Sequence, residues 1–231
     1  MKFFKPHLEN YQDENIFWAS MSDLLLGLTI VFMVLFVLSV MGITKQKIEQ
    51  ENLKNKIVQQ LSQEFAKADI PVEIDKRSGA IKISELELFK LNDWTISDKG
   101  KAYLNKVVPT YLGTILGNPE IKKNIAQIII EGHSDSQSFK NLNKEQNYVK
   151  NLDLSVKRSL AVSSYIISIN SSKKDKYKDD LMKLLSTTGR SFSDPVLVKG
   201  KEDYSKSRRV ELKFQLRDYN FIDLLRKYKF K

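Results

Sequence analysis

The chain lacks cysteine, which excludes disulfide bonds, cysteine nucleophiles and thiolate metal sites. It also lacks a Ser-His-Asp arrangement, a cluster of metal ligands and a phosphate-binding loop, so the sequence predicts no enzyme, no cofactor and no metal site. A nucleic-acid fold motif and a basic stripe interleaved with aromatic residues are absent too, although the formal net charge is +10. Because the lysine and arginine residues are scattered, we expect anionic partners such as phospholipid surfaces or cell-wall polymers, and no direct contact with nucleic acid.

Charge is missing from one long stretch, because residues 24–43 contain no Asp, Glu, Lys or Arg. A helix of this length, rising ~1.5 Å per residue, spans the ~30 Å hydrocarbon core of a bilayer. The stretch is too long and too far from the N-terminus for a signal-peptide core, and no A-x-A-like cleavage site follows it. We therefore predict an uncleaved transmembrane helix over residues 16–44, after an N-terminal tail over residues 1–15.

One carboxylate, Asp23, lies at the start of this stretch, in FWASMSDLLLGLTIVF, and two interpretations of it remain open. In the first, Asp23 caps the helix or pairs with its dipole at the membrane surface. In the second, Trp18 marks the surface and Asp23 lies roughly 7–8 Å deeper, where an ionised acid costs on the order of 2.5–3.5 kcal/mol and is kept for a function such as carrying ions. Ser22 and Thr29 would then support the ion path, although hydrogen bonds between helices explain them equally well.

The connector over residues 45–70 contains no glycine and no proline. Its apolar residues recur at steps of four and five, at Ile48, Leu53, Ile57, Leu61 and Phe65. This spacing predicts that the membrane helix continues as an amphipathic helix. Two functions of the apolar face remain open: packing on the chain's own domain, or parallel pairing of two copies.

The rest of the chain alternates between strand and helix patterns. PVEIDKRSGAIKIS alternates apolar and polar residues on both sides of KRSG, which predicts a β-hairpin with Gly79 at its turn. An amphipathic helix should follow, with Ser97 as its N-cap and a kink or break at Pro109, and Ser155 should cap a later helix. A short apolar run in NIAQIIIEGHSD and the alternation in RRVELKFQL predict two further strands. This order predicts an α+β domain with the helices on one face of a mixed sheet.

Four segments, IIIEGHSD, NLDLSVKRSLAVSSYI, TTGRSFSDPV and SRRVELKF, resemble in order and spacing the OmpA-like peptidoglycan-binding domain. The upstream LFKLNDWTISDKGKAYLNKV resembles that family's first loop and helix. The resemblance implies a pocket for the diaminopimelate of a peptidoglycan stem peptide, in which an Asp holds the amine and an Arg holds the carboxylate. Matched by motif, the peptidoglycan-binding residues are Asp135, Asn151, Arg158 and, from the closing strand, Arg209 with Arg208 as its alternative.

The segment SFKNLNKEQNYVK makes the loop between Asp135 and Arg158 longer than that family's, and we expect it to reposition or cover the pocket. Structural functions remain the alternatives for each residue: a turn cap for Asp135, a surface position on a helix for Arg158, and a structural cation for Arg209. His133 is expected to be a packing residue, because no second histidine lies near it in the sequence.

The membrane segment, with Trp18 shortly before Asp23, resembles the B subunit of ion-driven rotary stators (the MotB family). SDLLLGLTIVF is more similar to the B subunit of the Zorya anti-phage defence system (ZorB) than to the flagellar type. The resemblance implies a homodimer of this chain inside a ring of five multi-span A subunits, with protons, or alternatively Na⁺, passing through Asp23. A flagellar-type stator subunit and a passive cell-wall tether without ion conduction are the alternatives.

The two indications of membrane orientation disagree. Lysines at positions 45, 47, 54 and 56 follow the span, so a positive-inside count places the C-terminal side in the cytoplasm. The resemblance implies the reverse: a single-pass protein of the bacterial inner membrane, with its N-terminus in the cytoplasm and its OmpA-like domain, residues 71–217, in the periplasm. We follow the resemblance, and we assign residues 218–231 to a C-terminal tail.

Overall fold

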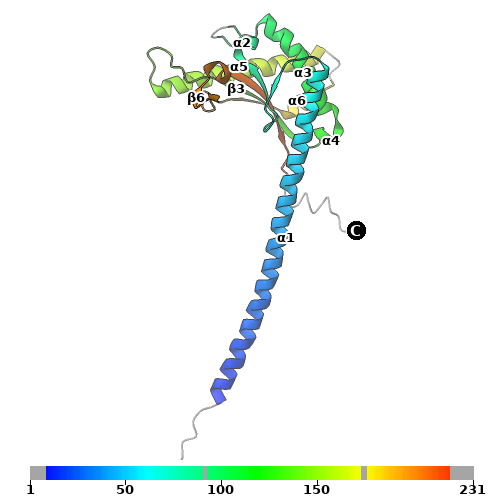
Figure 1. Cartoon of the computed structure of the whole chain (residues 1–231), viewed down its shortest axis with the longest axis vertical. Helices are drawn as coiled ribbons and strands as arrows, with labels where there is room; N and C mark the ends of the chain where they lie inside the picture. Colours follow the sequence, from blue (N-terminus) through cyan, green and yellow to red (C-terminus); the bar gives the residue numbers. More distant parts are fainter. Residues whose placement is uncertain (1–8, 91–92, 173–175, 219–231) are drawn as a thin grey trace, which may run out of the picture. The chain divides into compact units, whose positions relative to one another are not determined.

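The computed structural model describes residues 9–90, 93–172 and 176–218 (Figure 1). These residues fall into two compact units, one up to Glu49 and the other from Gln50 onward. One uninterrupted helix, α1 (Glu9–Lys67), supplies the described residues of the first unit and the beginning of the second. The absence of glycine and proline between residues 45 and 67 explains why the helix continues through the predicted connector.

In the first unit, α1 carries large apolar side chains on all sides, and those between Ile16 and Ile43 are exposed. Among the described residues, it is the helix long and apolar enough to cross a membrane by length and composition. The hydroxyls of Ser20, Thr29 and Thr44 each donate to the carbonyl oxygen four residues earlier, at 2.7–2.9 Å. These hydroxyl protons therefore need no further partner in lipid.

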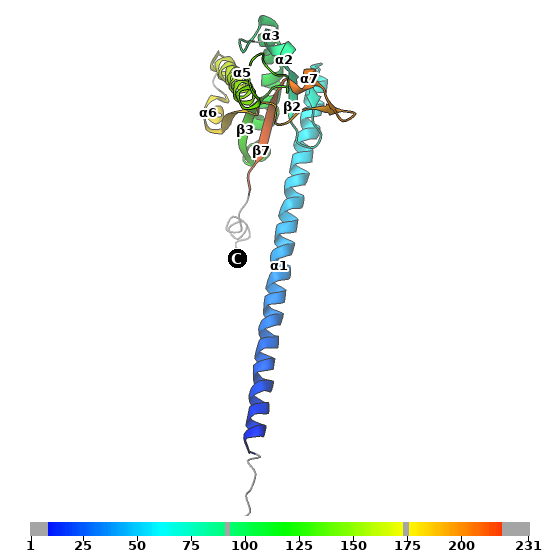
Figure 2. The ribbon, with the colours of Figure 1, turned by 90° about the vertical axis from the view of Figure 1, so that its left-hand side faces the viewer.

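The second unit is built on a mixed five-stranded sheet in the order β1-β2-β7-β3-β4 (Figure 2). β3 and β4 run parallel, and the other neighbours run antiparallel. The strands are β1 (Glu73–Ile74), β2 (Ile81–Ser84), β3 (Ile125–His133), β4 (Leu185–Gly189) and β7 (Arg209–Leu216). β5 (Leu197–Val198) and β6 (Lys201–Glu202) form a separate two-stranded sheet. The predicted hairpin is confirmed, with Gly79 in the left-handed region at φ +73° between β1 and β2.

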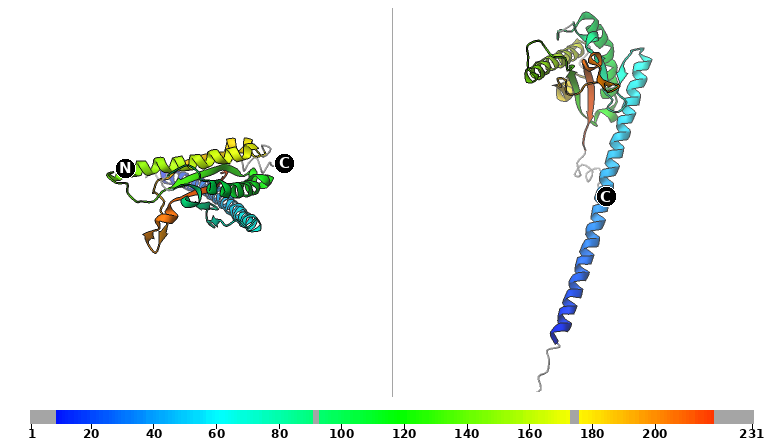
Figure 3. Two further views of the ribbon diagram at one scale, coloured as in Figure 1. Left: turned by 90° about the horizontal axis from the view of Figure 1, so that it is seen from above. Right: turned by 60° about the vertical axis from the view of Figure 1, so that its left-hand side comes forward.

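Two long helices accompany the sheet: α3 (Asp98–Gly117) and α5 (Lys144–Ser172), the latter lying along β3 and β4 (Figure 3). The short helices are α2 (Glu85–Leu88), α4 (Pro119–Lys122), α6 (Lys178–Leu184) and α7 (Tyr204–Ser207). The predicted α+β fold with a mixed sheet is confirmed.

The two faces of the sheet differ in chemistry, as the alternation of side chains along a strand requires. In β3, Ile128 and Ile130 are buried in the hydrophobic core, together with residues of α3 and α5. Glu131, the next residue, points to the opposite face, where it meets Glu211 and Lys213 of β7. The helices therefore cover the apolar face, and the other face carries a cluster of charged side chains.

The apolar side of α1 packs on the chain's own domain within the second unit. Ile57, Leu61 and Phe65 are 0%, 0% and 1% exposed in the hydrophobic core, and Leu53 packs at its edge. Ile48, the first residue of the predicted stripe, is 56% exposed. Of the two functions left open for this face, the structure shows packing on the own domain from Leu53 to Phe65.

The start of α5 differs from the prediction. Ser155 is not an N-cap, because α5 begins three turns earlier, at Lys144. Asn143 and Gln146 form a reciprocal capping box there, with Asn143 Oδ1 accepting from the Gln146 amide at 2.8 Å and Gln146 Oε1 accepting from the Asn143 amide at 3.1 Å. Half of the inserted segment is thus helix.

The start of α3 agrees with the prediction. Ser97 caps the helix by accepting a 3.0 Å hydrogen bond from the Gly100 amide. Pro109 does not split α3, which continues as one helix from Asp98 to Gly117.

Candidate functional site

A pocket of about 540 Å³ lies beyond the C-terminal end of β3, beside α2 and α5. The structure brings three of the four predicted peptidoglycan-binding residues together in it, Asp135, Asn151 and Arg158, and does not bring Arg209. The side chains that line it are those of Glu85, Ser134, Asp135, Gln137, Ser138, Phe139, Lys140, Asn151, Leu154, Arg158 and Arg208.

Two glycines allow α5 to approach the sheet beside this pocket. A Cβ atom at Gly132 would lie 2.1 Å from the carbonyl oxygen of Ser155, and one at Gly189 would lie 2.6 Å from its hydroxyl. Ser155 Oγ in turn accepts from the Ser191 amide at 3.2 Å, and the Ser191 carbonyl accepts from the Ser134 amide at 2.9 Å. The close contact therefore joins the loops after β3 and β4, which places the residue following Ser134 at the pocket.

Asp135, the residue that follows Ser134, is 6% exposed. Its Oδ1 accepts from the Gln137 amide at 3.2 Å, and its Oδ2 accepts from the guanidinium of Arg208. The Gln137 contact is the turn-capping hydrogen bond considered as an alternative. Asp135 also lines the pocket, so the turn-capping contact and a binding function are compatible.

Arg158 comes from the middle of α5 and is 3% exposed. Its Nη2 lies 2.5 Å from Glu85 Oε1, its Nε donates to the Asp93 carbonyl at 3.1 Å, and its guanidinium lies 5.5 Å from the ring centroid of Phe89. Burial lowers the pKa of Arg158, and the Glu85 carboxylate opposes that shift. Arg158 is therefore a buried, paired cation and not a surface helix residue.

Asn151 lies on α5, two turns before Arg158 and on the same side of the helix. It is 3% exposed, and its Nδ2 donates to the Asn147 carbonyl at 3.1 Å. Asn147 also fixes the inserted segment, because its Oδ1 accepts from the Phe139 amide at 2.7 Å. The segment therefore forms a wall of the pocket through Phe139 and Lys140, and its remainder extends α5.

Glu85 is the pocket residue that the sequence analysis missed. It is 4% exposed and connects the two arginines, with Oε1 at Arg158 and Oε2 3.4 Å from Nε of Arg208. The signal was present in the sequence: Glu85 continues the buried alternation of Ile81 and Ile83 in β2, where an apolar residue would be expected. Asp135, Arg208, Glu85 and Arg158 thus form a chain of alternating charge.

Arg209 faces away from this pocket, on the charged face of the sheet. Its Nε lies 2.5 Å from Glu211 Oε1 and its Nη2 lies 2.9 Å from Asp194 Oδ2. Arg208, one residue earlier, precedes β7 and reaches the pocket instead. The geometry gives Arg209 the structural function that was its alternative.

His133 belongs to the same charged face. It is 1% exposed, and its Nε2 lies 3.1 Å from Glu131 Oε1. His133, Glu131 and Glu211 have the donor atoms for a metal ion, but the ammonium of Lys213 lies 2.5 Å from Glu131 and 2.8 Å from Glu211. Burial raises the pKa of Glu131, but the contact with His133 and the hydrogen bond from Lys213 outweigh this and lower the pKa to about 2. Lys213 takes the position of a cation, so we interpret the cluster as structural.

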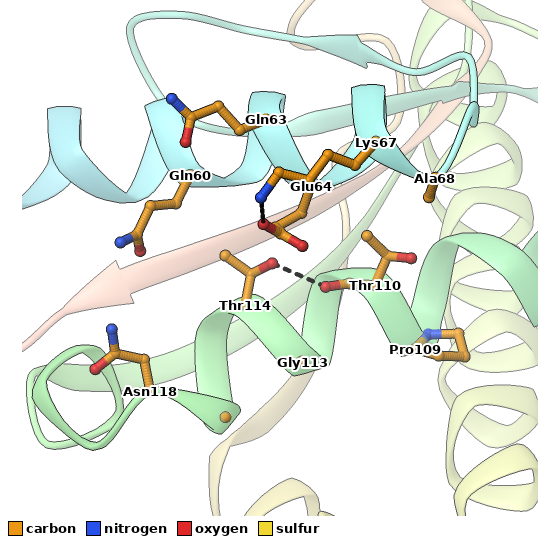
Figure 4. Close-up of a pocket in the computed structure, with 11 residues that line it drawn as sticks. Gln60, Gln63, Glu64, Lys67, Ala68, Pro109, Thr110, Gly113, Thr114 and Asn118 are labelled. Atoms are coloured by element: carbon orange, nitrogen blue, oxygen red, sulfur yellow. Dashed lines mark hydrogen bonds and ion pairs between the residues drawn. The ribbon is translucent and has the colours of Figure 1, made fainter.

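A second cavity, of about 840 Å³, lies between the end of α1 and α3 (Figure 4). The two charged residues that line it, Glu64 and Lys67, form an ion pair of 2.7 Å with each other. The hydroxyl of Thr114 donates to the Thr110 carbonyl. This cavity therefore offers less to a charged ligand than the pocket of Asp135 and Arg158.

In the first unit, Asp23 lies several turns inside α1, which already runs from Glu9. The interpretation of Asp23 as a helix N-cap is therefore wrong. Ser22 and Asp23 are exposed on the helix, and Thr29 Oγ1 donates to the Leu25 carbonyl at 2.7 Å. The hydroxyl of Thr29 is thus available to a second group as an acceptor only.

Comparisons with known proteins agree with one another. No family model matches the chain. The chain is 32% identical over 223 residues to the Zorya protein ZorB of Escherichia coli strain Crooks, covering 92% of this chain and 93% of that relative. It is 28% identical over 213 residues to a Zorya protein ZorB of Escherichia coli O139:H28, covering 87% and 81%. The solved structure of a MotB-like protein from Desulfovibrio vulgaris shares the fold, with a TM-score of 0.51 at 16% identity over 76% of this chain and 98% of that one.

Proposed function

This chain belongs to the family of Zorya protein ZorB and is a stator-B-like component of Zorya-type defence; from that premise we propose that it is the peptidoglycan-anchored subunit of a proton-driven motor in the bacterial inner membrane. The observation that carries the proposal is one chain with two distinct charged sites. One is Asp23, the single carboxylate in the apolar stretch of α1 between Ile16 and Ile43, and the other is a buried pocket of paired arginines and carboxylates.

The pocket suits the zwitterionic head of diaminopimelate in a peptidoglycan stem peptide. Asp135 supplies a fixed anion for the ligand ammonium. Arg158 has five N–H donors and uses two of them within the described structure, at Glu85 and Asp93, which leaves an edge of the guanidinium for the ligand carboxylate. Asn151 adds an amide to the same wall. We assign the anchoring function to the domain of residues 71–217.

Asp23 is the proposed ion carrier. Ala19 and Gly27 lie one turn before and one turn after it on the same side of α1, so a neighbouring helix can approach the carboxylate closely. Moving one charge across ~100 mV yields about 2.3 kcal/mol, enough to drive small rearrangements of packed helices. Ser22 and Thr29 would line the path. We propose H⁺ as the ion, with Na⁺ as the alternative.

The proposed partners follow from these two sites. Asp23 can exchange its proton only where protein, and not lipid, surrounds it. A ring of five multi-span A subunits around a homodimer of this chain would supply that environment. A pocket for peptidoglycan is useful only in the periplasm. We therefore place the domain of residues 71–217 there and the tail of residues 1–15 in the cytoplasm, as a single-pass inner-membrane protein.

The experiment replaces Asp23 in cells that carry the complete defence system. Asp23→Asn keeps the shape of the side chain and removes its exchangeable charge, so proton flux and protection from phage should fall to background while membrane insertion and retention on sacculi stay unchanged. Asp98→Asn, at a fully exposed acid on α3, is the matched control. Full protection by Asp23→Asn would leave the passive tether as the better hypothesis.

The anchoring half is tested separately by the retention of the full-length protein on purified sacculi. Asp135→Ala should release the protein, and Arg158→Lys should weaken retention because lysine lacks the planar fork. Lys157→Ala, on the exposed side of α5, is the control. Equal retention of all the variants would reject the pocket as the anchor.

A further inference from the structure

Two oxygens of residues that line the pocket, Glu85 Oε2 and Ser134 Oγ, lack a hydrogen-bond partner among the described residues, and the first belongs to a carboxylate. Glu85 Oε2 is buried, and none of the described residues donates a hydrogen bond to it. Its sister atom Oε1 is held by Arg158 at 2.5 Å. Buried carboxylate oxygens in proteins nearly always accept a hydrogen bond, so an orphan acceptor on a residue that lines a pocket points to a donor that arrives with a ligand.

Glu85 and Asp135 flank the same cation. Arg208 donates to Asp135 Oδ2 through Nη1, and its Nε lies 3.4 Å from Glu85 Oε2, too poorly aligned for a hydrogen bond. The Arg208 side chain is 28% exposed, whereas that of Arg158 is 3% exposed. An entering ammonium can therefore compete with Arg208 for both carboxylates at the open side of the pocket.

Arg158, by contrast, is already paired before any ligand arrives. Its Nη2 is bound to Glu85 and its Nε to the Asp93 carbonyl. A ligand carboxylate placed on the remaining edge would meet a cation that Glu85 has partly neutralised, and it would lie close to the negative charge of Glu85 itself. The attraction it gains is smaller than at an unpaired arginine.

We propose that Glu85 is a further ligand-binding residue, which accepts the ligand ammonium together with Asp135; this rests on the proposed binding of peptidoglycan. With two carboxylates on the ammonium, the pocket selects its ligand by the ammonium more than by the carboxylate. The pocket then accepts stem peptides whose third residue is diaminopimelate, amidated diaminopimelate or lysine. All three carry the ammonium, and only the first carries the free carboxylate.

The test is calorimetric titration of the full-length protein in detergent micelles with four soluble stem peptides. Three carry diaminopimelate, amidated diaminopimelate or lysine, and the fourth carries diaminopimelate acetylated on its side-chain amine. We expect the dissociation constants of the first three to agree within about threefold, and acetylation to weaken binding by at least about tenfold. A wild-type preference of more than about tenfold for the free carboxylate over lysine would overturn the proposal.

Glu85→Gln supplies the second arm. It removes the competing charge, so the preference for diaminopimelate over lysine should rise to about tenfold, while the affinity for the lysine peptide falls. Glu87→Gln, on the same short helix but outside the pocket lining, should change neither the preference for diaminopimelate over lysine nor the affinity for the lysine peptide. An unchanged preference in a folded Glu85→Gln would refute the assignment, and if that variant does not fold, the wild-type series alone decides.

The two proposals fail in different ways. If wild-type protein binds none of the four peptides, the proposed anchoring function fails and this inference fails with it. If it binds diaminopimelate peptides strictly through the carboxylate and loses them in Asp135→Ala, the anchoring function stands and only the inference about Glu85 is lost.

Discussion

Leu61 tests whether the end of α1 is part of the domain core or a surface for pairing two copies. Its side chain is 0% exposed and lies between Ile57 and Phe65, which are equally buried. Leu61→Ala removes three buried carbon atoms and leaves a cavity, which costs about 2–5 kcal/mol in well-packed cores. A domain of this size loses about 2–4 °C of Tm per kcal/mol, so we expect Tm to fall by about 4–20 °C.

The matched control is Ile48→Ala on the same helix, where the side chain is 56% exposed and little should change. The measurement is thermal unfolding of the full-length protein in detergent, followed by circular dichroism at two protein concentrations. If Ile48→Ala lowers Tm more than Leu61→Ala does, and if the effect of Ile48→Ala on Tm shrinks on dilution, then pairing of copies and not core packing stabilises this helix, and the reasoning is wrong.

Two further predictions concern the sheet. Gly132→Ala places a methyl group 2.1 Å from the Ser155 carbonyl oxygen, so it should destabilise the domain by about 1–3 kcal/mol in denaturant unfolding and weaken retention on sacculi. The control is Gly113→Ala, which has open space around it inside α3 and should stabilise the domain by up to about 1 kcal/mol. Equal effects of the two substitutions would contradict the close contact at Gly132. The pKa of Glu131 is lowered to about 2 in the folded protein. The ionised Glu131 therefore contributes fully to the free energy of unfolding above its ordinary pKa of 4.5, and this contribution is lost as the pH falls through 2. The unfolding free energy should therefore drop by up to about 3 kcal/mol between pH 5 and pH 2, and a drop of the same size in Glu131→Gln would refute this.

Motifs located most of the pocket from the sequence because each carries its own local geometry. GHSD ends the strand predicted from the apolar run, so Asp135 was expected just beyond the end of that strand, where the structure places it. Asn151 and Arg158 are two helical turns apart and were bound to share a side once both lay in one helix. These placements depend on contacts within one supersecondary unit.

The parts that were missed or misplaced depend on contacts between distant segments. Glu85 enters the pocket because β2 pairs with β7 and brings α2 beside Arg208, a partnership that spacing along the chain does not reveal. The choice between Arg208 and Arg209 depends on where β7 begins, and a shift of one residue reverses the side of the sheet. Ser155 was taken for a cap because the stronger capping box at Asn143 lay inside what looked like a loop insertion.

The charges of the pocket bear on the proposed binding of an anionic cell wall. Asp135 and Glu85 cancel Arg158 and Arg208, so Lys140 is the one pocket residue that adds to the formal net charge of +10, and the rest of that charge lies elsewhere on the chain. Attraction between scattered lysines and an anionic polymer acts over distances comparable with the ~8–10 Å screening length of physiological salt, and it carries no specificity. Recognition in the pocket is different, because buried partners at hydrogen-bond distance are screened much less. The scattered lysines can hold the domain near the wall, but only the pocket can distinguish stem peptides, by the ammonium that they present.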